Sequence, residues 1–274
     1  MGTKKIADIF QRSLVAHLPP TSFSLLQNAS VFIGGLGGGS NIAELLARKG
    51  VGHQTIADLD VFEPHNVRQR GSLSSTWGRS KVDVMTERLL DINPNMTVTP
   101  VREGVTLENV SGLVRRSTVV VDMLDFHALK EKVALYQAAR AHGKVVVTTP
   151  SVVNGAVLYI FTPEGPTFEQ FFGYEPSIPP GELALRFLRR LITHYPSEAP
   201  EEVYQAAARG ERTIPLDAVG VDQASVLAAV AVENLILGRR DRVVTIPRGI
   251  QVDLSDPAYL VRIVDFTRDF GGAA

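Results

Sequence analysis

The sequence predicts an α/β fold: a Rossmann-like, doubly wound, mostly parallel sheet with antiparallel strands added at the C-terminal end. First, the apolar run 31–33 leads into the glycine-rich turn 34–39 and then into a helical pattern. Second, the β-branched run 117–124 (STVVVDML) is typical of a strand buried in a parallel sheet. Third, strands and helices alternate up to residue 150, as they do in a doubly wound sheet.

The elements of the first half follow from apolar spacing and from stop signals. Apolar residues at positions 42, 45 and 46 predict a helix that runs to about Lys49 and stops at Gly50. The remaining expected elements are strands at 54–57, 96–101, 117–124 and 144–150 and helices at 80–90 and 128–141.

The second half has a different character. Residues 163–182 are rich in proline, glycine and aromatic residues, which predicts a loop. The other expected elements are a strand at 155–165, helices at 183–192, 201–209 and 217–237, and antiparallel strands at 242–246, 249–254 and 259–264.

Length and composition predict one domain over residues 1–274, since neither an internal repeat nor a long linker divides the chain. A net charge of −1 gives no indication of general DNA binding. The chain has no cysteine, which excludes disulfides, a cysteine zinc site and thiol chemistry by this chain. The N-terminus has no signal-peptide run, and the apolar stretch 223–232 is too short to span a bilayer. We therefore expect a cytoplasmic protein with no membrane segment.

The glycine-rich turn is the first candidate site. Glycines between a strand and a helix let the backbone approach a phosphate, and the helix N-terminus offers free N–H groups. Asp58 follows at the end of the second strand, where an acid can hold ribose hydroxyls. The match is imperfect, because Leu36 stands where the dinucleotide fingerprint has its second glycine, so a tight turn without a ligand is the alternative. The candidate nucleotide-contacting glycines are Gly34, Gly35, Gly37, Gly38 and Gly39.

Five further blocks follow the turn in order: DLD at 58–60, NVRQR at 66–70, GRSK at 78–81, INPNMTV at 92–98 and DMLDF at 122–126. With these blocks the chain resembles, over nearly its whole length, the ThiF/MoeB/HesA family of E1-like enzymes, which activate carboxylates as acyl-adenylates. The resemblance implies an ATP- and Mg²⁺-dependent adenylyltransferase. It also divides the chain into a helical segment (1–27), a nucleotide-binding half (28–150) and an acceptor-binding and dimerisation half (151–274).

The resemblance also assigns roles in the nucleotide site. Asp58 would hold the ribose, Asp60 would support that turn, and Asn66 and Lys81 would reach the phosphates. Cations are needed there because a carboxylate attacking a phosphate brings two negative charges together. Without the other blocks, Lys81 at a helix start would be interpreted as a solvated lysine.

Two further roles complete the catalytic set. Asp125 would lie beside the α-phosphate and bind Mg²⁺. Arg12, in FQRSL, stands roughly where family members lend an arginine across a homodimer to the partner's ATP. Asp122 shares the strand end with Asp125 and is interpreted either as a helix cap or as a site residue.

The chain departs from the family pattern at several positions. The family's Arg-Gln pair falls on Gln69 and Arg70 in inverted order, so Arg68, Gln69 or Arg70 could contact phosphate. Arg70 is the first choice and Arg68 the second. Phe126 replaces the asparagine that follows the key aspartate.

The segment GPTFEQFF at 165–172 stands where many members have Pro-Cys-x-x-Cys, and Thr167 and Gln170 fall near the zinc-ligand positions. The resemblance therefore implies neither a structural zinc nor a catalytic cysteine. The reaction would stop at the adenylate, or the adenylate would pass to a nitrogen, a sulfide donor or a second protein. The carboxylate would belong to a peptide C-terminus, a small carrier protein or an RNA-linked amino acid.

Two alternatives stay open at this stage. An NAD(P)-dependent oxidoreductase would use the same glycine turn and predicts a Lys–Asp or Tyr–Lys pair near the nicotinamide. A non-catalytic nucleotide-binding scaffold is favoured by Leu36, by Phe126 and by the inverted Gln69–Arg70 pair. Asp222 is interpreted as an acid that complements a helix dipole. The aromatic residues at 168–174 either fold onto the sheet or line an acceptor groove.

Overall fold

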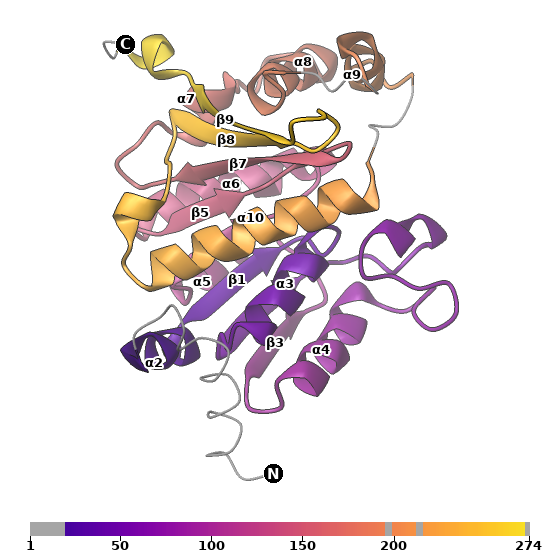
Figure 1. The fold of residues 1–274 in the computed structure, drawn as a ribbon, viewed down its shortest axis with the longest axis vertical. Coiled ribbons are helices and arrows are strands. Elements are labelled where there is room, and N and C mark those ends of the chain that lie inside the picture. Colours follow the sequence, from indigo (N-terminus) through magenta and orange to yellow (C-terminus); the bar gives the residue numbers. More distant parts are fainter. Residues whose placement is uncertain (1–19, 195–198, 212–215, 272–274) are drawn as a thin grey trace.

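The computed structural model describes residues 20–194, 199–211 and 216–271. The strands in these ranges are β1 (Ser30–Gly34), β2 (His53–Ala57), β3 (Thr97–Val101), β4 (Val119–Asp122), β5 (Val145–Thr148), β6 (Ser151–Val152), β7 (Gly155–Phe161), β8 (Arg248–Asp253) and β9 (Leu260–Asp265). They form one sheet in the order β3-β2-β1-β4-β5-β7-β8-β9, with β6 paired to β7 (Figure 1). Strands β3, β2, β1, β4 and β5 are parallel, and every pairing from β7 onward is antiparallel. The predicted fold class is confirmed.

Helices cover both faces of this sheet. One face carries α2 (Pro20–Asn28), α3 (Gly39–Arg48), α4 (Lys81–Ile92) and α10 (Ala218–Ile236). The other face carries α5 (Val110–Arg115), α6 (Leu129–Ala141), α7 (Phe168–Phe172), α8 (Pro180–Leu191) and α9 (Glu201–Ala208). Short 3-10 turns are η1 (Pro64–Arg68), η2 (Phe126–Ala128), η3 (Arg240–Arg242) and η4 (Thr267–Phe270).

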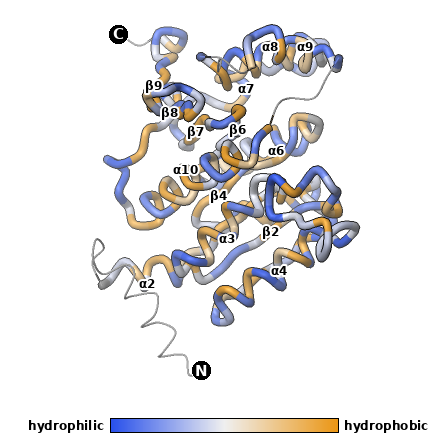
Figure 2. The backbone as a smooth tube through the Cα atoms, turned by 45° about the vertical axis from the view of Figure 1, so that its right-hand side comes forward, coloured by the Kyte–Doolittle hydropathy of each residue, from blue (hydrophilic) through white to orange (hydrophobic). Residues whose placement is uncertain are grey.

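The alternation of side chains along each strand explains the two cores. Val31 and Ile33 of β1 belong to the core under α3, α4 and α10, whereas Phe32 between them belongs to the core under α6 and α7. All three are fully buried. Because both faces of β1 are covered, the sequence of β1 is a continuous apolar run. Figure 2 shows the same hydrophobic character in β4.

Helix α10 corrects one step of the sequence interpretation. It has 19 residues and is long and apolar enough to cross a membrane. The short length of 223–232 therefore does not exclude a membrane span. The helix packs instead against β7 and α3, and 56% of its apolar window is buried inside the fold. A Cβ added to Gly220 would lie 1.9 Å from the carbonyl oxygen of Val153, so this glycine permits the close approach. We conclude that α10 is a core helix of the sheet.

The expected strand at 242–246 is wrong. Its start belongs to η3, Val243 is extended, and no residue from 243 to 246 is part of a strand. Ile246 donates one backbone hydrogen bond to the Ile160 carbonyl at 3.0 Å, and Pro247 then has no N–H with which to continue a ladder. Regular pairing therefore begins only with β8.

The expected loop at 163–182 is also wrong in part, because it contains α7 and the first turn of α8. Thr167 Oγ1 accepts a hydrogen bond from the Gln170 amide, and the Gln170 side chain accepts one from the Thr167 amide. These two residues, which fall near the family's zinc-ligand positions, thus form a capping box. The short elements α5 and β6 were not predicted either; α5 contains Gly112 and valines, which are weak helix formers.

Candidate nucleotide-binding site

The candidate site lies at the carboxyl ends of three neighbouring parallel strands. Strand β1 lies between β2 and β4, and the glycine turn, Asp58 and the turn 122–125 follow these three strands. The winding reverses here, since β2 and β3 lie on one side of β1 and β4 and β5 on the other. Ligands of open α/β sheets bind at such a switch point.

The glycine turn packs directly on the turn that follows β4. Gly35 has a φ of +90°, and a Cβ added there would lie 2.3 Å from the Met123 carbonyl oxygen. A Cβ on Gly38 would lie 2.7 Å from Met123 Cε. No side chain caps the N-terminus of α3, which begins at Gly39. The turn therefore leaves a helix N-terminus, a ready anion site, at the strand ends.

Asp58 supports the glycine turn from β2. Its Oδ2 accepts a hydrogen bond from the Leu36 amide at 2.6 Å, and its Oδ1 accepts one from the Asp60 amide at 2.8 Å. Burial raises the pKa of Asp58 although the charge of Lys81 and these two amides oppose the shift. Leu36 itself is fully buried, so its side chain does not obstruct the turn.

Lys81 is held beside this carboxylate. Its Nζ lies 3.0 Å from Asp60 Oδ2 and 3.8 Å from Asp58 Oδ1, and its backbone amide donates to the Asp60 carbonyl at 3.0 Å. Ser80 Oγ caps α4 by accepting from the Asp83 amide. Because the Lys81 side chain is only 9% exposed, the interpretation as a solvated lysine is wrong.

Asn66 and Gln69 connect the crossover after β2 to the glycine turn. Asn66 Oδ1 accepts from the Glu63 amide at 2.8 Å, and Asn66 Nδ2 donates to Gln69 Oε1 at 3.1 Å. Gln69 Nε2 lies 3.3 Å from the position of a Cβ added to Gly37. Thus Asn66 shapes the loop, and Gln69 is the side chain of this crossover that lies against the glycine turn.

The two arginines of this segment have different surroundings. Arg70 Nε lies 3.0 Å from Glu44 Oε2, and Arg70 Nη2 lies 3.2 Å from Asp222 Oδ1. The Nε atoms of both arginines are buried without a hydrogen-bond partner, but the Arg68 side chain, unlike that of Arg70, forms no ion pair within the described residues. Arg70 is therefore held by two carboxylates, whereas the guanidinium of Arg68 is unpaired.

The cluster formed by Glu44, Arg48, Arg70, Arg88 and Asp222, named the acidic centre, was not expected from the sequence. Glu44 accepts hydrogen bonds from Arg48 at 2.7 Å and Arg88 at 2.7 Å and faces Arg70. Burial would raise the pKa of Glu44, but these hydrogen bonds and positive charges together lower it to about 2. Only the i,i+4 spacing of Glu44 and Arg48 could have indicated any part of this centre.

Asp222 belongs to the same region, so its interpretation as a dipole-complementing acid is wrong. The N-cap of α10 is Asp217, whose side chain accepts from the Val219 amide, and Asp222 lies beyond the first turn. Asp222 Oδ1 instead accepts from Asn41 Nδ2 at 2.6 Å. Through this bond and Arg70 it joins α10 to α3 and to the crossover.

Asp125 follows β4 and is the N-cap of η2, where its side chain makes no capping hydrogen bond. It is exposed, and its carboxylate has no ion pair within the described residues. The preceding turn is anchored by the Met123 amide, which donates to the Gly34 carbonyl at 2.8 Å. Phe126 has a structural role, because its ring meets that of Phe187 edge-on at 5.1 Å. Arg12 lies outside the described residues.

A Lys–Asp–Tyr cluster of the kind that the oxidoreductase alternative requires is present, but it is buried. Asp122 Oδ2 accepts hydrogen bonds from Lys132 Nζ at 2.6 Å and from the Tyr136 hydroxyl at 2.8 Å. The three residues are 0%, 9% and 6% exposed. Because the groups are enclosed by protein, they offer no proton donor to a nicotinamide or a substrate.

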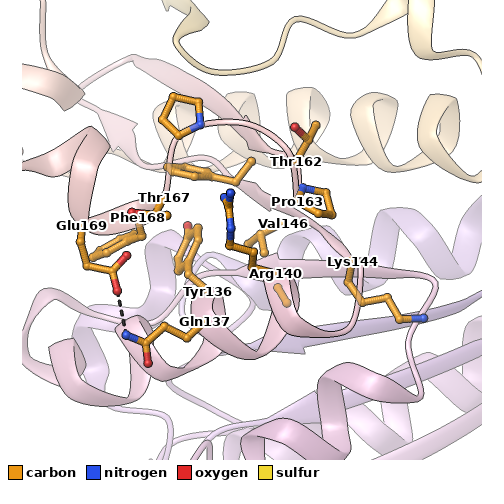
Figure 3. A pocket seen from close by; sticks show the side chains of 13 residues that line it. Tyr136, Gln137, Arg140, Lys144, Val146, Thr162, Pro163, Thr167, Phe168 and Glu169 are labelled. Carbon is orange, nitrogen blue, oxygen red and sulfur yellow. Dashed lines mark hydrogen bonds between the residues drawn. The ribbon is translucent and has the colours of Figure 1, made fainter. Parts of the chain in front are cut away.

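A cavity of about 100 Å³ lies away from this site, between α6 and residues 162–169 (Figure 3). None of its lining residues belongs to the glycine turn, to 58–81 or to 122–125. Of the aromatic residues in question, only Phe168 lines it, and Phe168, Phe171 and Phe172 are all core residues. These aromatic residues thus fold onto the sheet, as one of the two interpretations expected.

Comparison with protein families shows the family of the chain. The family model described as "ThiF family" matches residues 10–242. The chain belongs to the ThiF family. A tRNA threonylcarbamoyladenosine dehydratase of Haemophilus influenzae is 36% identical over 120 residues, which is 43% of this chain and 46% of that protein. The molybdopterin-synthase adenylyltransferase of Salmonella typhimurium is 33% identical over 138 residues, 45% of this chain and 55% of that protein.

The alignments thus span about half the length of the curated relatives of this ThiF-family chain. The crystal structure of E. coli MccB with MccA-N7isoASN superposes with a TM-score of 0.70 at 16% identity, covering 93% of this chain and 71% of that one. At this identity the likeness shows the fold alone. The resemblance inferred from the five sequence blocks is confirmed at the level of the family.

Proposed function

We propose that this ThiF-family protein is an ATP- and Mg²⁺-dependent adenylyltransferase that activates a carboxylate as an acyl-adenylate. One observation supports this above the others. At the switch point of the sheet, an uncapped helix N-terminus and an exposed, unpaired carboxylate follow neighbouring strands, and a buried lysine at the start of α4 contacts the acids that follow β2. Such a site provides positive groups for phosphates and an oxygen ligand for a metal.

The proposed nucleotide contacts start from Asp58. Together with Asp60 it would receive the ribose side of ATP, while the glycine turn and Lys81 receive the phosphates. Arg68 is the arginine proposed to contact a phosphate, because its guanidinium forms no ion pair within the described residues. Arg70, like Lys81, would have to exchange a carboxylate partner for the phosphate. Gln69, which touches Gly37, would fix the distance between the crossover and the phosphates.

Asp125 would bind Mg²⁺ together with phosphate oxygens. Mg²⁺ in nucleotide enzymes is commonly held by one or two carboxylates plus the substrate phosphates, so one free carboxylate fits the donor set. No cluster of three or more metal-ligating side chains exists among the described residues, in keeping with a metal that arrives with its nucleotide. The ion would supply charge neutralisation at the α-phosphate.

The acceptor is proposed by analogy. The relatives named above are a tRNA-modifying enzyme and an adenylyltransferase of a molybdopterin synthase, so a carrier-protein C-terminus, a peptide C-terminus or an RNA-linked amino acid would provide the carboxylate. Because the chain has no cysteine, the adenylate would not pass to a thiol of this chain. Residues 151–274 would bind the acceptor, and a homodimer would bring Arg12 to the partner's ATP. A cytoplasmic location stays a prediction of the sequence.

The first experiment is calorimetric titration of the protein with ATP–Mg²⁺, with NAD⁺ and NADP⁺ run in parallel. We expect ATP to bind and the dinucleotides not to bind. ATP–pyrophosphate exchange would then be measured with each class of carboxylate in turn. Binding of a dinucleotide without ATP would contradict the proposal.

One observation favours a non-catalytic nucleotide-binding scaffold. Arg70 is paired with the carboxylates of Glu44 and Asp222 rather than left unpaired for a ligand. The two proposals differ in a simple way. A scaffold would bind ATP but would catalyse no pyrophosphate exchange with any of the three carboxylate classes. An adenylyltransferase would catalyse exchange with one of them.

A further inference from the structure

The buried carboxylate of Asp122 connects helix α6 to the turn that carries Asp125. Asp122 is the last residue of β4 and is fully buried. On one side its Oδ2 accepts from Lys132 and Tyr136, both on α6. On the other side its Oδ1 accepts from the Leu124 amide at 3.1 Å. Both oxygens of a single carboxylate therefore hold two different segments.

The second of these segments is the one that presents Asp125. Leu124 directly precedes Asp125, and Met123 is bonded to Gly34 and packed on Gly35. A displacement of Asp122 would thus move the turn relative to the glycine loop. The position of the Asp125 carboxylate depends on how firmly Asp122 is held.

Lys132 and Tyr136 hold it firmly. A buried ion pair is costly to desolvate, and apolar side chains of similar volume are often equally stable or more stable. Stability alone therefore does not explain why an Asp–Lys pair occupies this position. Tyr136 is clamped by aromatic rings, with Phe161 at 4.7 Å and Phe168 at 4.5 Å between centroids. Figure 3 shows Tyr136 beside Phe168. Burial and the adjacent charge of Asp122 raise the pKa of Tyr136 well above its usual value, so its hydroxyl stays a donor.

We propose that Lys132 and Tyr136 are positioning residues: through Asp122 they fix the turn that presents Asp125 to the nucleotide. This inference rests on the proposed adenylation. Both residues lie on α6 behind Asp122, and neither belongs to the glycine turn, Asp58 or Lys81. We therefore expect their loss to displace Asp125 more than the groups that bind the nucleotide.

The main test is Tyr136→Phe, which keeps the clamped ring and removes only the hydroxyl. Tyr159→Phe is the matched control, because Tyr159 is also buried but its hydroxyl donates to the Arg190 carbonyl on α8 rather than to Asp122. We expect kcat of ATP–pyrophosphate exchange to fall roughly tenfold or more in Tyr136→Phe, with KM for ATP within about twofold, because small misplacements of reacting groups slow chemistry. The control should keep both values.

Amide hydrogen exchange provides a readout that does not need catalysis. We expect the amides of Met123 and Leu124 to exchange faster in Tyr136→Phe and in Lys132→Met, but at the wild-type rate in Tyr159→Phe. Wild-type exchange at these amides in Tyr136→Phe would overturn the inference, as would a wild-type kcat per folded molecule. If the wild-type protein catalyses no pyrophosphate exchange, the proposed function fails. The amide rates then still decide whether Lys132 and Tyr136 hold the turn.

Discussion

Lys81 Nζ lies 3.0 Å from Asp60 Oδ2 and 3.8 Å from Asp58 Oδ1, so one buried cation faces both acids that follow β2. The arrangement holds the ammonium group beside Asp58, whose other oxygen supports the glycine turn, before any nucleotide is bound. It also fixes the direction of the lysine, because the side chain is enclosed and its backbone amide is bonded to Asp60. This preorganisation is what a phosphate site requires.

Replacement of Lys81 by alanine should weaken ATP binding far more than adenosine binding. A charged hydrogen bond to a phosphate contributes about 1.5–3 kcal/mol, which is roughly a tenfold to hundredfold rise in Kd for ATP. Adenosine, which has no phosphate, should bind within about twofold of wild type. Calorimetry with both ligands measures this, and equal losses for the two would argue against a phosphate contact.

Asp125→Asn should abolish pyrophosphate exchange while ATP affinity stays within a few-fold of wild type. The lost charge acts on the metal and the transition state, so kcat should fall by roughly 10²–10³-fold. Asp241→Asn is the control, because Asp241 is an exposed acid in η3, remote in sequence from the site residues. Normal turnover in Asp125→Asn would exclude the proposed metal role.

The parts of the site that the sequence could predict are those fixed by local spacing. The glycine turn, Asp58 and Lys81 follow strand and helix ends at regular intervals, so the alternation of elements brings them to one edge. The acidic centre could not be predicted, because its contacts join distant segments: Asn41 and Asp222 are 181 residues apart. Asp222 therefore looked like an ordinary helix acid.

A contact between segments distant in sequence also explains the wrong strand prediction at 242–246. The 242–246 run has strand-like composition, but its neighbour in space, the end of β7, offers it a single bond before Pro247. The aromatic segment at 168–172 looked like a loop because of its prolines and glycines. Its capping box, Thr167 with Gln170, was present in the sequence as a T-x-x-Q pattern and could have predicted α7.

Gly35→Ala should destabilise the protein, because its Cβ would meet the Met123 backbone and its φ is positive. We expect a loss of about 2 kcal/mol or more in the free energy of unfolding, measured by urea denaturation. Gly112→Ala is the opposite control: a Cβ there meets nothing within 4 Å in the middle of α5. That variant should gain about 0.5–1 kcal/mol, and equal effects of the two would contradict the close packing of the glycine turn.

Trp77 should report ATP binding by fluorescence. It is the single tryptophan of the chain, it is 64% exposed, and it lies four residues before Lys81 in a segment bridged to Phe62. Ordering of phosphates at Lys81 should alter its surroundings and give a saturable change in emission. The same titration with Lys81→Ala should require a higher ATP concentration. An emission that stays constant while calorimetry detects ATP would exclude contact between this segment and the nucleotide site.

The acidic centre predicts a specific loss of stability at low pH. The pKa of Glu44 is lowered to about 2, so the folded state holds the ionised form more strongly than the unfolded chain does. Its contribution is fully present above the unfolded pKa of 4.5 and disappears as the pH falls towards 2. Glu44→Gln should therefore be less stable than wild type at pH 7, by about 1–3 kcal/mol, and the difference should shrink between pH 4.5 and pH 2.

Urea denaturation at pH 7, 5, 4 and 3 measures this difference. Glu211→Gln is the matched control, since Glu211 also pairs with an arginine, Arg209, but both side chains are exposed. Exposed pairs of this kind contribute little, so the control should follow wild type at every pH. A stability difference for Glu44→Gln that stays constant from pH 7 to pH 3 would show that the side chain acts through packing rather than through its charge, and that the three arginines do not hold it ionised.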